Sequence, residues 1–317
     1  MRPIQNAITT LFRCILFVAT LAPTTLATAQ VMHQVESVPG GVVVIELGHY
    51  AEKPEVEFFK SRVLVVEEPN TTGKSLWYAI VGIPLQVNEV DVKPGKYFIW
   101  VMPKQQNRHQ LSFDIHAKKY LTQYITLPPE KSHSVEPDLE AMKRVETEYA
   151  IIQKAAKTWE YKPNVPLKME PPVVGIFTGS FGLKRFYNNK PRRPHSGMDI
   201  AAPRGTPIKV SAPGKVILTG DFFFAGNTVF VDHGQGLISM YCHMDSISTQ
   251  LGHHLKQGEV LGTVGSTGRA TGPHLHWSVY LNNTVVNPAL FIPKSYTHRK
   301  ATPRTKKLSV GEQDRGR

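Results

Sequence analysis

The stretch Ala270–Tyr280, with the sequence ATGPHLHWSVY, places two histidines on either side of one leucine, directly after a Gly-Pro turn. Alternate side chains of a β-strand point to the same face of a sheet. His274 and His276 would therefore share one face, roughly 6 to 7 Å apart along the strand. The pattern predicts a strand that carries part of a site, whose other parts come from elsewhere in the chain.

The region around this stretch has the pattern of an all-β domain. Runs such as TPIKVSAPGKVILTGDF, NTVFVDHG and LISMYCH alternate with glycine turns, and no helix longer than about two turns is indicated. Seven of the 13 histidines of the chain lie between residues 195 and 276. The chemistry of the protein is therefore expected in this region.

The segment PHSGMDIAAPRGTPI places His195 four residues before Asp199. Its prolines and glycines disfavour a helix, so a turn at Ser196-Gly197 is needed to bring the imidazole and the carboxylate together. His276 would complete a set of two imidazoles and one carboxylate. Such ligands suit a borderline cation such as zinc, and three of them leave one tetrahedral position open, as in catalytic zinc sites.

His274 lies too far along the strand from His276 for both to bind one tetrahedral ion comfortably. His243, in the run SMYCHMDSI, could reach the same cleft from a neighbouring strand. Such a pair could accept a proton from the attacking water, stabilise a developing oxyanion and protonate a leaving amine.

These motifs have a close counterpart among known proteins. PHSGMDIAAPRGTPI, GNTVFVDHG, MYCHM and GSTGRATGPHLHW resemble, in the same order, the lysostaphin-type (LytM) zinc metallopeptidases of bacteria over about 120 residues. The resemblance implies zinc ligands at His195, Asp199 and His276, and catalytic histidines that do not bind the metal at His243 and His274. It also implies an open β-fold and hydrolysis of peptide bonds in peptidoglycan.

The remainder of the chain has an organisation that fits Gram-negative members with an N-terminal β domain, which FGLKRFYNNKPRRPHSG also resembles. Short β-type runs predict a small antiparallel sandwich. Apolar residues at steps of three and four, from Leu139 to Trp159, then predict an amphipathic helix, followed by an extended proline-rich linker. The predicted parts are a signal peptide (1–29), the N-terminal β domain (30–133), the helix and linker (134–172), the peptidase domain (173–293) and a basic, disordered tail (294–317).

The first 29 residues have the features of a secretory signal, with basic residues, the apolar run CILFVATLA and a small-residue cleavage site at Ala27-Thr28-Ala29. The run is too short to span a bilayer, which argues against a membrane anchor. Cleavage after Ala29 would remove it, so no integral membrane segment is expected in the mature protein. The remaining chain has 35 Lys and Arg against 25 Asp and Glu, a net charge of +10, and Cys242 as its one cysteine. An exported, basic protein without a disulfide is expected to meet anionic envelope polymers in the periplasm or outside the cell. No motif predicts nucleic-acid binding.

Two readings compete with an exported zinc endopeptidase that cuts peptidoglycan cross-links. One is a non-catalytic wall-binding or amidase-activating module of the same fold, although such modules typically lose metal ligands that this chain retains. The other is a general secreted protease that uses the same residues. In some relatives an upstream asparagine or the N-terminal domain covers the zinc, and Asn189 is the candidate here. A regulatory partner in the envelope is a further expectation.

Overall fold

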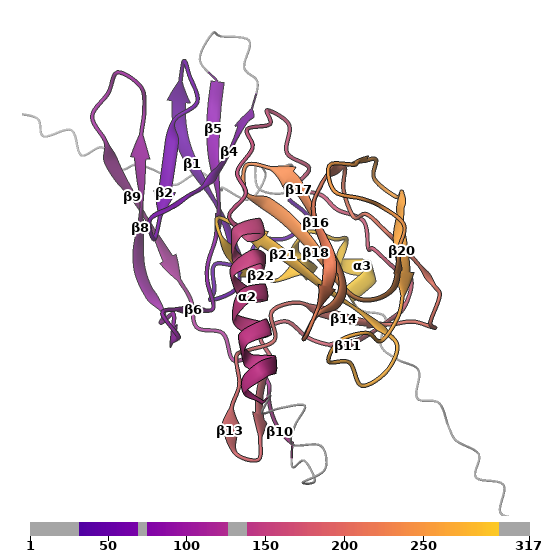
Figure 1. The fold of residues 1–317 in the computed structure, drawn as a ribbon. Helices are drawn as coiled ribbons and strands as arrows, with labels where there is room; N and C mark the ends of the chain where they lie inside the picture. The colour runs from indigo at the N-terminus through magenta and orange to yellow at the C-terminus, as the bar shows by residue number, and fades with distance from the viewer. Residues whose placement is uncertain (1–31, 69–74, 126–137, 298–317) are drawn as a thin grey trace, which may run out of the picture.

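The computed structural model describes residues 32–68, 75–125 and 138–297. Strands form both the N-terminal and the C-terminal parts of this range, and one long helix lies between them (Figure 1). The prediction of a mainly β protein is therefore confirmed. The predicted signal peptide lies outside the described residues. Within the described ranges, no helix is both long enough and apolar enough to cross a bilayer.

The N-terminal part is a sandwich of two antiparallel sheets, as predicted. The order of one sheet is β1-β5-β4 and that of the other is β3-β2-β8-β9, while β6 and β7 form a separate hairpin. The strands are β1 (Val42–Tyr50), β2 (Glu55–Phe58), β3 (Ser61–Arg62), β4 (Leu64–Glu68), β5 (Ser75–Gly82), β6 (Gln86–Val87), β7 (Val90–Asp91), β8 (Gly95–Met102) and β9 (His109–Ile115). Apolar side chains from both sheets, among them Trp77, Ile99 and Phe113, form the core between them.

The C-terminal part is built on one large sheet. Its main path is β11-β14-β21-β18-β17-β16-β19, with β15, β20 and β22 attached to it. The strands are β11 (Ile176–Gly179), β14 (Met198–Ala201), β15 (Pro207–Lys209), β16 (Gly214–Phe222), β17 (Gly226–Gly234), β18 (Leu237–Ile247), β19 (His254–Leu255), β20 (Val260–Val264), β21 (His274–Leu281) and β22 (Thr284–Val286). The stretch ATGPHLHWSVY thus supplies an inner strand of this sheet.

The two parts share a hydrophobic core, which the separate sequence patterns did not predict. Successive residues of β5 point to opposite faces, so Trp77 and Ala79 enter the sandwich core whereas Tyr78 and Ile80 face the other way. Tyr78 and Ile80 belong to the same cluster as Trp277 and other residues of the large sheet. The sheet β1-β5-β4 is therefore buried on both faces.

The connecting helix, α2, spans Leu139–Ala156 and begins after Asp138, whose side chain accepts a hydrogen bond from the backbone N–H of Ala141 at 2.8 Å. It ends before Trp159, so the predicted apolar stripe is longer than the helix. Ala155 and Ala156 at its C-terminal end are buried against the large sheet, and Arg144 in the first half of the helix pairs with Asp221 of β16 at 3.3 Å, while Leu139 at the N-terminal end is 86% exposed.

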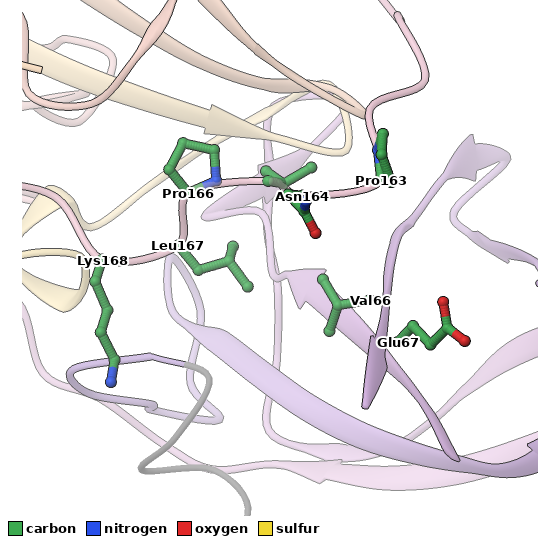
Figure 2. Close-up of a pocket in the computed structure, with 8 residues that line it drawn as sticks. Val66, Glu67, Pro163, Asn164, Pro166, Leu167 and Lys168 are labelled. Carbon is green, nitrogen blue, oxygen red and sulfur yellow. The ribbon is translucent and has the colours of Figure 1, made fainter. Parts of the chain in front are cut away.

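The proline-rich segment after α2 is extended, as predicted, but it also contributes to the core. Leu167 and Met169 are buried, and the backbone N–H of Met169 donates to the carbonyl of Phe291 at 2.7 Å. Together with β4 this segment forms a shallow pocket of about 370 Å³ (Figure 2). None of the predicted site residues lines that pocket.

A three-stranded sheet joins the segment before α2 to the C-terminal part. Here β10 (Thr122–Ile125) runs parallel to β12 (Lys184–Tyr187), which pairs with β13 (Lys190–Pro191). At the other end of the chain, the predicted start of the tail at residue 294 needs correction. A 3₁₀ turn (η2, Pro288–Leu290) and a short helix (α3, Lys294–Thr297) continue the ordered chain, because Tyr296 packs against the shared core. The rest of the predicted tail lies outside the described residues.

Candidate metal centre

The pairing of β14 with β21 brings the sequence motifs together. Asp199 lies directly opposite His276, which in turn lies opposite Cys242 on β18. Residues opposite one another in an antiparallel pair point to the same face of the sheet. One row across three strands therefore places the carboxylate and the imidazole side by side.

His195 reaches this row from the segment that precedes β14. Its backbone is held by two hydrogen bonds to the turn after β11, from His195 N–H to the Leu183 carbonyl at 3.0 Å and from Gly182 N–H to the His195 carbonyl at 2.8 Å. The chain then bends at Gly197 and enters β14. The predicted turn does bring His195 Nε2 to 3.0 Å from Asp199 Oδ1.

The three side chains converge on one point with the separations that a tetrahedral metal needs. His276 Nδ1 lies 2.9 Å from Asp199 Oδ1 and 3.1 Å from His195 Nε2. Ligands about 2.0 to 2.1 Å from a tetrahedral zinc ion lie about 3.3 Å from one another. The side chains are 8 to 13% exposed, so water has limited access to them. Two imidazoles and a carboxylate at these distances fit a zinc ion.

Neighbouring groups fix the orientation of both imidazoles. His195 Nδ1 donates to the carbonyl of Ser180 at 2.9 Å, which leaves Nε2 as the free acceptor of a neutral ring. His276 presents Nδ1 instead, because its Nε2 lies 2.9 Å from Ser278 Oγ. Glycine at position 179 is also required, since a Cβ there would lie 2.1 Å from Asp199 Oδ2.

His243 enters the site through a β-bulge. Between Asn227 and Val229 the register with β18 shifts by one residue, and His243 has a φ of 59°, in the left-handed region that a histidine rarely adopts. Without the extra residue, alternation would place His243 on the face of Tyr241, in the shared core. The bulge turns its ring toward the other face, 4.7 Å from the ring of His274.

The rings of His243 and His274 are held in the same way. His243 Nδ1 donates to the carbonyl of Thr267 at 2.9 Å, and His274 Nδ1 donates to that of Gly272 at 2.8 Å. In a neutral ring each therefore keeps Nε2 free to accept a proton. His274 Nε2 lies 3.9 Å from Asp199 Oδ1, so both rings stand beside the converging set.

Burial and neighbouring groups shift the pKa values of Asp199, His243 and His276. Burial alone would raise the pKa of Asp199, but the hydrogen bonds and charges of His195 and His276 hold that pKa well below its usual range. Burial lowers the pKa of His276. Burial and the nearby charge of His276 lower the pKa of His243 to about 4. At neutral pH His243 is therefore an available proton acceptor.

Asn189 is the residue that the sequence interpretation offers as a cover for the zinc. It occupies the exposed turn between β12 and β13, with a φ of 64° that suits asparagine in a tight hairpin. The side chain that approaches Asp199 from this segment is instead Arg185, whose Nη2 lies 3.8 Å from Asp199 Oδ2. Sequence reasoning missed Arg185, because only the fold of β12 onto the site reveals it.

Other histidines of the region have structural positions. His233 is buried, its Nδ1 donates to the carbonyl of Pro213 at 2.8 Å, and its Nε2 lies 2.8 Å from Ser239 Oγ. His253 and His254 lie exposed in a loop and at the start of β19. The structure thus brings together five of the six residues that the sequence placed at or near the site, whereas Asn189 lies in the exposed turn between β12 and β13.

The comparisons with known proteins match this architecture. Residues 193–288 match peptidase family M23, and residues 35–118 match the N-terminal domain of that family. A solved structure from Pseudomonas aeruginosa, assigned to peptidase M23, is 42% identical, with a TM-score of 0.65, over 81% of this chain and 95% of that one. The chain belongs to peptidase family M23.

Curated relatives are similar over a shorter stretch. The DD-carboxypeptidase/endopeptidase Mpg of Neisseria meningitidis is 40% identical over 120 residues, 38% of this chain and 28% of the relative. The peptidoglycan DD-endopeptidase ShyA of Vibrio cholerae is 39% identical over 94 residues, 30% of this chain and 22% of the relative. The matched stretch thus spans less than a third of the length of either relative.

Proposed function

We propose that this protein is an exported zinc metalloendopeptidase that hydrolyses peptide cross-links between the stem peptides of peptidoglycan. The observation that carries the proposal is the convergence of His195, Asp199 and His276 beside two further, correctly oriented histidines. The names of the Neisseria and Vibrio relatives support the substrate class.

The residues divide into a metal-binding set and a proton-transfer pair. A zinc ion held by His195, Asp199 and His276 would polarise the scissile carbonyl and make a water more acidic. His243 and His274 stand next to that position with Nε2 free. A ring in this state takes the proton that the attacking water loses as its oxygen bonds to the carbonyl carbon. The same proton then passes to the nitrogen of the breaking C–N bond, which leaves as an amine.

The strained backbone of His243 supports its part in this step. A histidine at a φ of 59° costs free energy that a purely structural position would avoid, and such strain concentrates where a side chain must be aimed. The ring centroid of His243 lies 6.0 Å from that of His276, so the ring stands beside the proposed metal-binding set.

The location and partners follow from charge and from the predicted signal peptide. Export would bring a chain of net charge +10 into the periplasm or beyond, where the wall is anionic. Stem peptides are the proposed substrate, nucleic acid is not a proposed partner, and an envelope regulator remains part of the proposal. A stem peptide whose leaving residue carries a free carboxylate next to the scissile amide nitrogen would be anionic at the site.

Digestion of purified sacculi with the mature, zinc-loaded protein tests the proposal. Mass analysis of the released fragments should show new stem-peptide ends at the cross-links, and a chelator should abolish their release. Binding to sacculi without any release would favour the non-catalytic wall-binding module. Cleavage of casein in preference to sacculi would favour the general protease.

A further inference from the structure

Arg185 is a positive charge at the candidate metal centre that neither the metal set nor the proton-transfer pair uses. It lies on β12, its side chain is 30% exposed, and its Nη2 lies 3.8 Å from Asp199 Oδ2. The preceding residue, Lys184, points the other way and pairs with Asp91 of the N-terminal domain at 2.6 Å. Alternation along β12 therefore directs one cation into the site and the other into the domain interface.

The guanidinium of Arg185 has N–H groups that make no hydrogen bond. A separation of 3.8 Å is too long for a hydrogen bond, and Asp199 Oδ1 is already shared between the two imidazoles. No other described residue accepts a hydrogen bond from this guanidinium. A partly exposed guanidinium that makes a long ion-pair contact but no hydrogen bond has N–H donors available to bind a carboxylate.

We propose that Arg185 binds the carboxylate next to the scissile amide nitrogen, and so selects peptides whose leaving residue has a free carboxylate. This inference rests on the proposed function. A carboxyl carbon attached to the carbon that bears the amide nitrogen lies about 2.5 Å from that nitrogen. Because Arg185 Nη2 lies 3.8 Å from Asp199 Oδ2, a substrate whose carbonyl lies at the His195–Asp199–His276 set would have that carboxylate within reach of the guanidinium.

A simpler role for Arg185 is to balance the charge of Asp199, and the two roles predict different kinetics. A counter-charge acts on the metal set, so its removal changes the rate for every substrate alike. A carboxylate-binding residue contributes only when the substrate has the carboxylate. The two can be separated by comparing a substrate with its uncharged amide.

The experiment uses the zinc-loaded mature protein and two cross-linked stem-peptide dimers, one with a free carboxylate next to the scissile amide nitrogen and one with that carboxylate converted to a primary amide. The wild type should cleave the acid with a kcat/KM about 10- to 100-fold higher than the amide, the size of one charge-assisted hydrogen-bonded pair. Arg185→Gln should lose this preference, with kcat/KM for the amide changed by less than about threefold. Lys184→Gln removes the same charge from the opposite face of β12 and should keep the preference.

Two further measurements make each outcome decisive. The zinc content of Arg185→Gln should equal that of the wild type, and calorimetry on a His274→Ala background should show tighter binding of the acid only when Arg185 is present. Equal losses for acid and amide, or no acid preference in the wild type, would overturn the role of Arg185. If sacculi are cut only at bonds without a neighbouring carboxylate, the proposed function stands and this inference fails. If sacculi and both peptides remain intact, both fail.

Discussion

At the scale of single residues, His274 and His276 stand two positions apart on β21 and use different ring nitrogens. His276 turns Nδ1 toward Asp199 at 2.9 Å, whereas His274 donates its Nδ1 to the carbonyl of Gly272 and leaves Nε2 at 3.9 Å from the same carboxylate. The nearer nitrogen of His276 is thus one ångström closer to Asp199 Oδ1 than that of His274, which fits the proposed role of His276 as a ligand and of His274 as its neighbour. The order of the two roles can be tested by substitution.

Replacing either histidine should give different defects. His276→Ala, like His195→Ala or Asp199→Ala, should lose both bound zinc and activity, because two ligands rarely hold the ion. His274→Ala should retain zinc and lose about 10²- to 10⁴-fold in kcat, the usual contribution of general acid–base catalysis. Metal analysis of the purified variants, together with release of fragments from sacculi, measures both. Loss of metal in His274→Ala with retention in His276→Ala would reverse the assignment.

His233 should make the stability of the protein depend on pH. Burial lowers its pKa from 6.5 to about 4, so the folded state stays unprotonated at pH values where the unfolded state takes up a proton. Above about pH 6.5 His233 therefore leaves the free energy of unfolding unchanged. As the pH falls from 6.5 toward 4, the free energy of unfolding decreases by about 3 kcal/mol in total, because only the unfolded state binds the proton.

His233→Gln isolates this effect, because glutamine can still bond to the Pro213 carbonyl and Ser239 but has no proton to gain. The difference in unfolding free energy between wild type and variant, measured with urea, should shrink by about 3 kcal/mol from pH 7 to pH 4. Parallel curves for the two proteins over this range would show that His233 is not the titrating group.

At the scale of elements, the site depends on how strands cross. The histidine spacing and the turn before Asp199 were predictable, because alternation and turn residues act over a few positions. The bulge on β18 was not, since it depends on the pairing of that strand with β17 and leaves no mark in the run MYCHM. Arg185 was missed for the same reason, because its place beside Asp199 comes from the fold of β12 and not from any local pattern.

Gly179 offers a test of the strand crossing. β11 passes so close to β14 that a Cβ at this position would lie 2.1 Å from Asp199 Oδ2. Gly179→Ala should displace the carboxylate and weaken zinc affinity about 10- to 100-fold, as for other groups that orient a metal ligand. Gly220→Ala on β16, where the nearest atoms are the ring tip of Phe222 at 3.2 Å, serves as a matched control. Competition with a fluorescent zinc chelator measures both, and equal affinities would count against the tight crossing.

At the scale of the whole molecule, the N-terminal sandwich and the large sheet are one structural unit. The sequence divides them by a helix and a proline-rich linker, and that division was predicted. The burial of β5 on both faces was not predicted, because its run LWYAIVG is apolar throughout and does not show which part of the protein covers each face. Tyr78 and Ile80 settle this by joining the cluster around Trp277.

Asn282 holds the same interface through polar groups. Its Oδ1 accepts a hydrogen bond from Gly82 N–H at 2.6 Å, and its Nδ2 donates to the Gly82 carbonyl at 2.9 Å, so a buried amide satisfies both backbone groups at the end of β5. An apolar replacement would leave those two groups buried and unpaired. The two-residue turn of Asn282 and Asn283 has positive φ at both positions, so alanine is strained at either one.

Asn283→Ala is therefore the matched control for Asn282→Ala. Asn283 is exposed and contacts Ser61 Oγ at 3.2 Å, so its variant carries the backbone strain without the buried loss. We expect Asn283→Ala to lower the free energy of unfolding by about 1 kcal/mol and Asn282→Ala by about 2 to 4 kcal/mol more.

Because the core is shared, the wild type should unfold in one cooperative transition when urea unfolding is followed by both tryptophan fluorescence and circular dichroism. Two separate transitions in the wild type would mean that the sandwich folds independently of the large sheet. Equal losses in the two variants would mean that Asn282 does not couple the sandwich to the sheet that carries the candidate metal centre.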